Sequence, residues 1–567
     1  MFSETFGRYV RHAALADASA AFLVVLLLVP QALAYAQLAG LPPTAGLFAS
    51  MAPLAVYALV GGSAGVALSL GPVAILSLMT AAALQPLAEQ GMAMYMAGAA
   101  ALTLMVGLFL LVMGVLRLGW IANFLSHPVI GGFVAGSAIL IALSQLGHLL
   151  GLRLSGQQLP ELLPSLWQQI DRVHLPTALV GGGAVLLLYL LRQVPRLPLA
   201  PALGNWLVRL GALLVVVLGL GLNYWLDLEA LGVAVVGAVP AGLPTWQWPP
   251  LDWALYRQLW APALLIALVG FIESISIAHS LEARRRRSVN PDQELRGQAG
   301  ANLASALTGG FAVSASFSRS ALALETPVAT PKVGLWVALM MLAAAMGLAP
   351  LLQHLPQAAL AATIVVAILR LVDLGALRHT WRYSRQDGIA ALATLVGVLV
   401  HGVESGIVLG VGLSLLLYLW RTSRPHIAVL GLLPGTEHFR NVDRYDTLQS
   451  DKVLSLRVDE SLYFPNARYL EEQVAAQVAL HPKVRHVVLQ CSAVNLIDAS
   501  ALDSLTAIAA RLQSAGQQLH LAEVKGPVMD RLRRADFLSR FGGQVFVSQY
   551  EALRCLDPDL LGRQRTV

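Results

Sequence analysis

The sequence predicts an α-helical protein that crosses a membrane many times and continues into a water-exposed α/β domain. Of its 567 residues, 57% are hydrophobic and only 12% are charged, and the mean hydropathy is +0.67. This composition is typical of polytopic membrane proteins and excludes an ordinary soluble enzyme. Long apolar runs extend as far as Arg424, whereas charged residues are frequent after it. The change in composition separates the two parts.

The membrane part is predicted to cover residues 13–424 and to contain fourteen spans in two sets of seven. The first set covers about residues 13–225 and the second about 261–420. Basic residues favour the cytoplasmic side, so residues 1–12, with Arg8 and Arg11, are expected there. The same rule orients the other basic loops consistently only if two short irregular stretches also count as crossings. Because seven is odd, the two sets are expected to be inverted repeats.

Three features of these spans are predicted from local sequence. The first span, 13–37, should be interrupted at Pro30 and Gln31. Residues 155–174 should form a polar loop. Residues 227–256 should form a long connection, whose tryptophans suit the membrane–water interface.

The two irregular stretches are Ser69–Ser77 and Ser314–Ser320. Inside a membrane, non-helical backbone is tolerated only where protein buries it or where it lines a cavity. Paired breaks in the two halves of a transporter indicate the substrate site. Each stretch predicts an extended run followed by a half-helix. Pro72 suits a first helical turn, and Ser316 or Ser318 suits an N-cap. Two helix N-termini meeting beside Arg319 would bind an anion.

The tail predicts a separate α/β domain over residues 437–567, because short strands alternate with amphipathic helices. Strands are expected at 452–458, 484–489, 518–524 and 544–548, and helices at 498–512 and 528–537. Cys491 and Cys555 both lie in this tail and indicate neither a disulfide framework nor a metal cluster.

Several motifs, in this order, resemble the SulP (sulfate permease) family of anion transporters. They are VPQALAY at 29–35, GLPPTAGL at 40–47, GPVAILSLM at 71–79, SFSRS at 316–320 and LPQA at 355–358. The tail is similar to a STAS domain, with Asp498-Ala-Ser500 at its signature loop. The resemblance implies a seven-plus-seven inverted repeat with core and gate domains, a cytoplasmic STAS domain, a homodimer and elevator-like alternating access.

Arg319 is the strongest candidate for substrate binding, because a charge inside a span is costly and is usually functional. The alternative is an arginine that snorkels to a membrane face. Gln31 and Tyr35 lie four apart on one helix face, where they could hydrogen-bond an oxyanion or a neighbouring helix. The resemblance adds contact positions at Phe317 and Ser318 and implies that Pro72 and Val73 line the site.

Glu273 is the candidate for proton coupling, since it lies in the middle of a span. Removal from water favours the neutral form of a carboxyl group, which could carry a proton together with the anion. The alternative is a structural salt bridge with Arg319. The resemblance implies proton coupling where Glu stands here. Sodium-coupled relatives have Asp here and a Thr one turn later, where this chain has Ile277, so the residue pair argues against sodium.

The remaining polar candidates have ordinary interpretations. His279, His401 and Glu404 are expected in solvated loops, and Arg284–Arg287 is expected to set the membrane orientation. Ser500 matches a phosphorylated position of STAS relatives, or else it simply begins a helix. Walker A, zinc, nucleophile-elbow and dinucleotide patterns are absent, so neither enzyme activity nor a cofactor is expected.

The sequence therefore predicts a secondary transporter of a small oxyanion in the inner membrane, with sulfate first and proton symport as the mode. Bicarbonate and dicarboxylates such as fumarate are alternative substrates. An uncoupled anion channel or exchanger, and a regulatory sensor that acts through its STAS domain, are alternative functions. The expected partners are the anion, a proton, the lipid bilayer and a second copy of the chain.

Overall fold

The computed structural model describes residues 14–61, 68–124, 126–156, 158–194, 201–237, 242–244, 246–283, 288–324, 330, 332–347 and 349–560. The predicted N-terminal segment 1–12 and the arginine run 284–287 lie outside the described residues. Two compact units, Met1–Ser414 and Leu415–Val567, make up the chain.

The first unit is almost entirely helical, as the composition predicts. In the first half the main elements are α2 (Ala14–Leu38), α3 (Pro43–Phe48), α4 (Ala52–Val60), β1 (Leu70–Gly71), α5 (Ala74–Leu84), α6 (Met92–Val115), α7 (His127–Leu150), α8 (Leu159–Gln169), α9 (Leu175–Gln193) and α10 (Pro201–Leu226). In the second half they are α11 (Trp253–Ala283), α12 (Pro291–Leu307), β2 (Ser314–Ala315), α13 (Phe317–Leu324), α14 (Val333–Gly347), α15 (Ala349–Leu352), α16 (Gln357–Ile368), α17 (Leu374–Tyr383), α18 (Arg385–His401) and α19 (Val403–Ser423). Among the described residues, eight helices or adjoining helix pairs are long and apolar enough to cross a membrane.

The two halves repeat one order of elements with opposite chain direction. The third segment of each half is a short strand followed by a short helix, β1–α5 in the first and β2–α13 in the second. The two strands pair antiparallel, with Leu70 opposite Ala315 and Gly71 opposite Ser314. Equivalent segments that run in opposite directions are what an inverted repeat requires.

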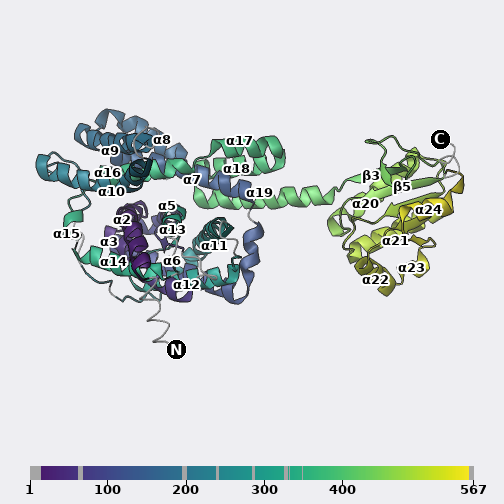
Figure 1. The fold of residues 1–567 in the computed structure, drawn as a ribbon, viewed down its shortest axis with the longest axis horizontal. Helices are drawn as coiled ribbons and strands as arrows, with labels where there is room; N and C mark the ends of the chain where they lie inside the picture. The colour runs from purple at the N-terminus through teal and green to yellow at the C-terminus, as the bar shows by residue number, and fades with distance from the viewer. Residues whose placement is uncertain are drawn as a thin grey trace. The chain divides into compact units, whose positions relative to one another are not determined.

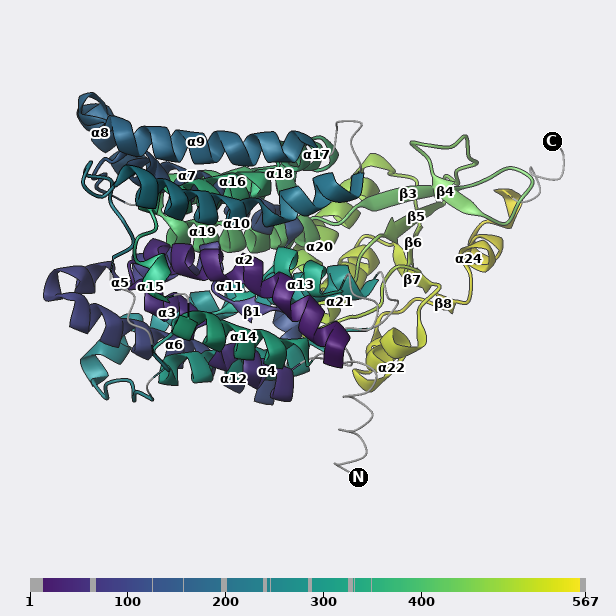
Figure 2. The ribbon, with the colours of Figure 1, turned by 60° about the vertical axis from the view of Figure 1, so that its left-hand side comes forward.

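The helices of this unit form two groups. The α2 group contains α2–α6 and α11–α14, and the α7 group contains α7–α10 and α16–α18; Figures 1 and 2 show them as two layers. Inside the α2 group, alanines bring α2 close to its neighbours. A Cβ on Gly46 of α3 would lie 1.9 Å from the carbonyl oxygen of Ala32, so only glycine fits there.

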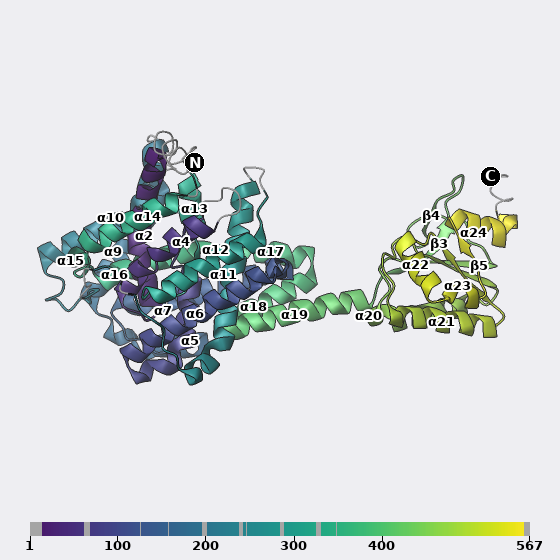
Figure 3. The same cartoon turned by 90° about the horizontal axis from the view of Figure 1, so that it is seen from below.

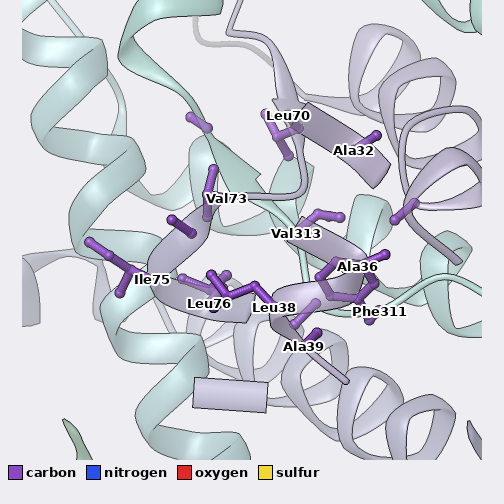
Figure 4. Close-up of a cluster of buried hydrophobic side chains, with 14 of the residues drawn as sticks. Ala32, Ala36, Leu38, Ala39, Leu70, Val73, Ile75, Leu76, Phe311 and Val313 are labelled. Atoms are coloured by element: carbon purple, nitrogen blue, oxygen red, sulfur yellow. The ribbon is translucent and has the colours of Figure 1, made fainter. Parts of the chain in front are cut away.

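Figure 4 shows the buried apolar side chains around the two strands. Ala32 and Ala36 of α2 lie beside Leu70, Leu76 and Val313, and all five are at most 1% exposed. The short strands are thus surrounded by protein, which satisfies the condition for irregular backbone in a membrane.

Three local predictions for the first unit were wrong. Helix α2 runs through Pro30 without a break, because neighbouring helices in a membrane protein can compensate for the missing hydrogen bond. The predicted loop at 155–174 contains the short helix α8. The sequence interpretation missed this helix because polar residues lie on both sides of it. Trp253 begins α11 instead of belonging to the preceding connection.

Asn302 of α12 holds the backbone that leads into β2, and its replacement should destabilise the first unit. Its amide donates to the carbonyl oxygen of Val313 (3.1 Å) and accepts from the Val313 N–H (3.0 Å), and the side chain is fully buried. Asn302→Leu would leave both backbone groups unpaired, at a cost of about 2–4 kcal/mol. Thermal unfolding in detergent measures the loss, with Thr308→Val, at a half-buried site, as the control. An unchanged midpoint for Asn302→Leu would contradict the assignment.

The second unit contains the predicted α/β domain. Its sheet has the order β4-β3-β5-β6-β7-β8, with β3 antiparallel to both neighbours and β5 to β8 parallel. Figure 2 labels all six strands, and Figure 3 shows the domain from another side. The strands are β3 (Ile427–Leu432), β4 (Phe439–Asn441), β5 (Val453–Val458), β6 (His486–Gln490), β7 (Gln518–Ala522) and β8 (Val545–Phe546). The helices are α20 (Phe464–Leu480), α21 (Ala499–Ser514), α22 (Gly526–Arg534), α23 (Phe537–Arg540) and α24 (Gln549–Leu556).

Alternate residues of the strands pack on opposite faces of this sheet. Leu489 packs with the helices α20 and α21 through Leu470 and Leu505, whereas Val488 packs with α24 through Ala552. The predicted strands and helices of the tail are confirmed, with small shifts at their ends. The sequence interpretation missed β3, β4 and α20, and β3 lies before the predicted domain start at 437.

A contact between the buried His520 of β7 and the half-buried His486 of β6 predicts that this domain loses stability in acid. The N–H of Gln544 donates to Nδ1 of His520 (3.2 Å), so the ring proton lies on Nε2, which is 3.1 Å from Nδ1 of His486. Burial, and the nearby His486, lower the pKa of His520 to about 4. Between about pH 6.5 and pH 4 the unfolded chain therefore binds a proton that the folded domain excludes.

The free energy of unfolding should consequently fall as pH decreases through this window, by on the order of 1–3 kcal/mol. Hydrogen exchange of β6 and β7 amides in the whole protein, compared at pH 7 and pH 5, measures this change after correction for intrinsic rates. His520→Gln should flatten the pH dependence. An equally steep dependence in wild type and variant would refute the role of this pair.

Candidate functional site

The two breaks in the helices face each other in the α2 group. The N–H of Ser316 donates to the Ser69 carbonyl oxygen (3.2 Å), and the N–H of Ser69 donates to the Ser320 hydroxyl (2.9 Å), so side-chain and backbone bonds extend the β1–β2 pairing. The predicted extended runs and half-helices are confirmed. The helix α5 begins at Ala74 with Val73 as its N-cap, however, so Pro72 precedes the helix instead of lying in its first turn.

Serines of α11 fix the second break. Ser274 accepts a hydrogen bond from the N–H of Ala315 (3.0 Å), and its hydroxyl lies 2.9 Å from that of Ser314. Ser314 in turn donates to the carbonyl oxygen of Gly270 (2.9 Å). These buried bonds hold β2 against α11, the helix that also carries Glu273. Sequence reasoning missed Ser274, although its place beside Glu273 in an apolar span was a usable signal.

Arg319 is fully buried and only partly paired. Its Nη1 donates to Oε1 of Gln31 (3.0 Å) and to the Pro72 carbonyl oxygen (3.2 Å). Nε and Nη2 are buried without a hydrogen-bond partner. A Cβ on Gly71 would lie 3.3 Å from Nη2, so glycine leaves room for the guanidinium. A buried cation with two unpaired donors favours an anion nearby.

A cavity of about 650 Å³ lies between the α2 group and the α7 group, beside Arg319. Six of the predicted site residues line it: Gln31, Tyr35, Val73, Glu273, Phe317 and Ser318. Pro72 and Arg319 are not among the lining residues. Arg319 is bonded to Gln31, which lines the cavity, and to the carbonyl oxygen of Pro72, which precedes the lining residue Val73. The first turns of α5 and α13 therefore reach one cavity through Val73, Phe317 and Ser318.

Glu273 brings a carboxyl group to this cavity from the middle of α11. Its Oε2 is buried without a hydrogen-bond partner, and its charge interacts electrostatically with that of Arg319. Within the described part of the chain, the two side chains form no direct ion pair, so the alternative of a structural salt bridge is not observed. One turn later Ile277 also lines the cavity, and it offers no oxygen to a cation.

Comparison with known proteins identifies the chain's relatives. Residues 15–394 match the model of the sulfate permease family, and residues 444–552 match that of the STAS domain. The chain belongs to the sulfate permease family. A probable sulfate transporter of Mycobacterium tuberculosis is 38% identical over 547 residues, which cover 95% of this chain and 94% of that protein. The chloroplastic sulfate transporter 4.1 of Arabidopsis thaliana is 32% identical over 555 residues, covering 95% and 80%.

Solved structures show that the sulfate permease fold is shared along the chain. SLC26A9 matches with a TM-score of 0.88 at 19% identity, over 98% of this chain and 91% of that one. The transmembrane domain of the cyanobacterial bicarbonate transporter BicA matches with a TM-score of 0.59 at 23% identity, over 70% and 97%. The predicted membrane fold with a C-terminal STAS domain is thereby confirmed.

Other predicted residues of this sulfate permease family member lie away from the cavity. His279 and His401 are exposed, but they lie within α11 and at the last position of α18 instead of in the expected loops. Glu404 lies in the first turn of α19 with Oε1 buried and unpaired, so the prediction of a solvated loop residue was wrong. Ser500 is exposed in the first turn of α21, where Asp498 provides the N-cap.

Two arginines that line the cavity were not predicted as site residues. Arg192 and Arg370 line it from the α7 group, and sequence reasoning took Arg192 only as a marker of membrane orientation.

Among the described residues, no cluster of three or more His, Cys, Asp or Glu is arranged to bind a metal ion.

Proposed function

We propose that this protein is a secondary active transporter of a small oxyanion, with sulfate as the first substrate, and that it moves the anion together with a proton. The observation that carries the proposal is the pair of facing helix breaks with the partly unpaired Arg319 beside one cavity. Helix N-termini offer free N–H donors and positive potential, and a buried guanidinium adds a full charge. The names of the M. tuberculosis and A. thaliana relatives support sulfate.

Anion binding would combine several kinds of donor. Backbone N–H groups at the starts of α5 and α13, the hydroxyl groups of Ser318 and Tyr35, and the amide of Gln31 all come from elements that reach the cavity. Arg319 holds Oε1 of Gln31, so the amide N–H₂ of Gln31 remains available to an oxyanion. The positive charge of Arg319 would attract an oxyanion bound beside Gln31, because charges interact strongly over a short distance in a medium of low dielectric constant.

Transport would follow an elevator-like movement of the α2 group against the α7 group. In support of this, the cavity lies between the groups, and all of the predicted binding residues belong to the α2 group. That group is internally fastened by the β1–β2 pairing and by Ser274. Movement of such a unit would carry the anion from one face of the membrane to the other.

Glu273 would carry the proton. Its buried, unpaired carboxyl oxygen has no neighbouring donor that would hold the ionised form, so uptake of a proton is favoured when an anion enters nearby. A neutral Glu273 also removes the negative charge that would repel the anion. We further propose that the protein lies in the inner membrane as a homodimer, with its N-terminus and STAS domain in the cytoplasm, where Ser500 is the candidate regulatory residue.

Uptake by reconstituted vesicles tests the function. Labelled sulfate should accumulate when the outside is acidified and should not accumulate when the pH gradient is collapsed. Competition by unlabelled sulfate, bicarbonate, fumarate and chloride ranks the substrates. If bicarbonate or fumarate accumulates in preference to sulfate, that anion is the substrate. Large anion currents without proton movement would show that the protein is a channel and not a transporter.

A further inference from the structure

Two arginines face the predicted binding residues across the cavity. Arg192 is the penultimate residue of α9, and Arg370 lies in the short 3₁₀ turn Leu369–Leu371 that follows α16. Both line the cavity that Gln31, Ser318 and Glu273 line from the other side. Their side chains are close enough for their charges to repel each other. Since α9 and α16 both end here, the pair marks one end of the cavity.

This end of the cavity has an excess of positive charge. Among the described residues, the charged ones that line the cavity are Arg192, Arg370 and Glu273, which leaves one net positive charge, or two when Glu273 is protonated. In the described part of the chain, neither arginine forms an ion pair. Two like charges held together without a carboxylate are unfavourable unless a mobile anion offsets them.

A purely structural role explains only one of the two residues. Arg192 donates through Nη2 to the carbonyl oxygen of Val366, and a cation at the C-terminal end of α16 is favourable. The same bond fixes the Arg192 guanidinium at the cavity wall. Arg370 is exposed, and the structure gives it no hydrogen bond. The position of Arg370 is therefore unexplained by helix capping.

We propose that Arg192 and Arg370 form an entry site that captures the oxyanion before it reaches Gln31 and Ser318. This inference rests on the proposed transport function. A cleft that is lined by charge of one sign and has walls of low dielectric constant raises the local concentration of the opposite charge and the rate of its arrival. The entry site lies on the α7 group, whereas the binding residues lie on the α2 group. When the two groups move apart, the anion leaves the arginines behind, so the entry site serves one face of the membrane only.

Transport kinetics measured separately in the two directions test the proposal. The variants are Arg370→Gln, Arg370→Glu and Arg370→Lys, with Arg378→Gln as the matched control, since Arg378 is an exposed arginine of the following helix and does not line the cavity. For transport from one face, Arg370→Gln should raise KM for sulfate about three- to tenfold and leave the maximal rate unchanged. Arg370→Glu should raise it further, and Arg370→Lys should restore it.

The effect should also depend on salt and on direction. The difference in KM between wild type and Arg370→Gln should shrink when ionic strength rises from about 0.02 M to about 0.3 M, because salt screens a charge at an open mouth. The KM for transport from the opposite face should stay at the wild-type value. A structural role of Arg370 would instead lower the maximal rate in both directions and would not respond to salt.

The outcomes separate this inference from the proposed function. If wild-type protein transports sulfate and Arg370→Gln and Arg370→Glu match it in both directions, the entry site is refuted. Equal changes of KM on both faces refute it as well. If Arg370→Gln fails to yield folded protein, Arg370→Ala, which also removes the charge at this exposed position, supplies the same comparison at low and high salt. If wild-type vesicles move no oxyanion, the proposed function fails, and the entry site fails with it.

Discussion

Arg319→Gln should reduce sulfate uptake by at least about 100-fold. The substitution removes the full positive charge that lies beside the two helix breaks, and it also removes the donors to Gln31 and to the Pro72 carbonyl oxygen. Arg319→Lys should restore little activity, because one ammonium group cannot reach both acceptors while two donors remain for the anion. Initial uptake of labelled sulfate by vesicles measures the loss.

A folding defect must be separated from a binding defect in this experiment. Thermal unfolding of the purified variant with and without sulfate provides that separation, since a ligand stabilises only the state that binds it. The expected result is a folded variant whose midpoint no longer rises with sulfate. Arg382→Gln, which changes an exposed arginine of α17, serves as the control. Near-normal uptake by Arg319→Gln would refute the central role of this guanidinium.

Glu273→Gln should abolish accumulation driven by a pH gradient while it leaves exchange of labelled for unlabelled sulfate largely intact. A glutamine keeps the size and neutral charge of the protonated carboxyl group but cannot release a proton. The anion should therefore still bind beside the permanently neutral side chain. Uptake against a concentration gradient and counterflow exchange, measured in the same vesicles, distinguish the two activities.

The chain offers a matched control for this substitution. Glu404 is a second glutamate with a buried, unpaired carboxyl oxygen, but it does not line the cavity. Glu404→Gln should leave the pH-driven accumulation unchanged. If Glu273→Gln still accumulates sulfate in response to the gradient, the proton must be carried elsewhere and the coupling proposal is wrong.

The course of the chain near the site could be predicted because the membrane makes irregular backbone expensive. A polar, small-residue stretch such as Ser314–Ser320 inside apolar sequence therefore had few structural explanations, and the breaks were found. Pro30 misled the same reasoning, since a proline that ends helices in water is tolerated inside α2. The hydrogen bonds of Ser274 and Asn302 depend on how distant helices pack, which the local sequence does not encode.

Charge patterns were informative about topology and less so about the site. Arg192 suited the rule that basic residues stay on one side of the membrane, and this sufficient explanation hid its place on the cavity wall. In the second unit, β3 follows α19 closely and its apolar letters do not alternate clearly with polar ones. Ile427 and Val429 of β3 are only half-buried, yet both are apolar, so β3 lacks the apolar–polar period of two that revealed β5.

The antiparallel pair β1–β2 also restricts the order of events during biosynthesis. Leu70 emerges from the ribosome long before its partner Ala315, and until then the backbone groups of β1 have no strand to pair with. The first repeat alone cannot assemble the pocket, because the start of α13, Ser318 and Arg319 all belong to the second repeat. A nascent chain halted before β2 should thus be inserted yet unable to retain an anion, and completion of the site should coincide with insertion of β2 and α13.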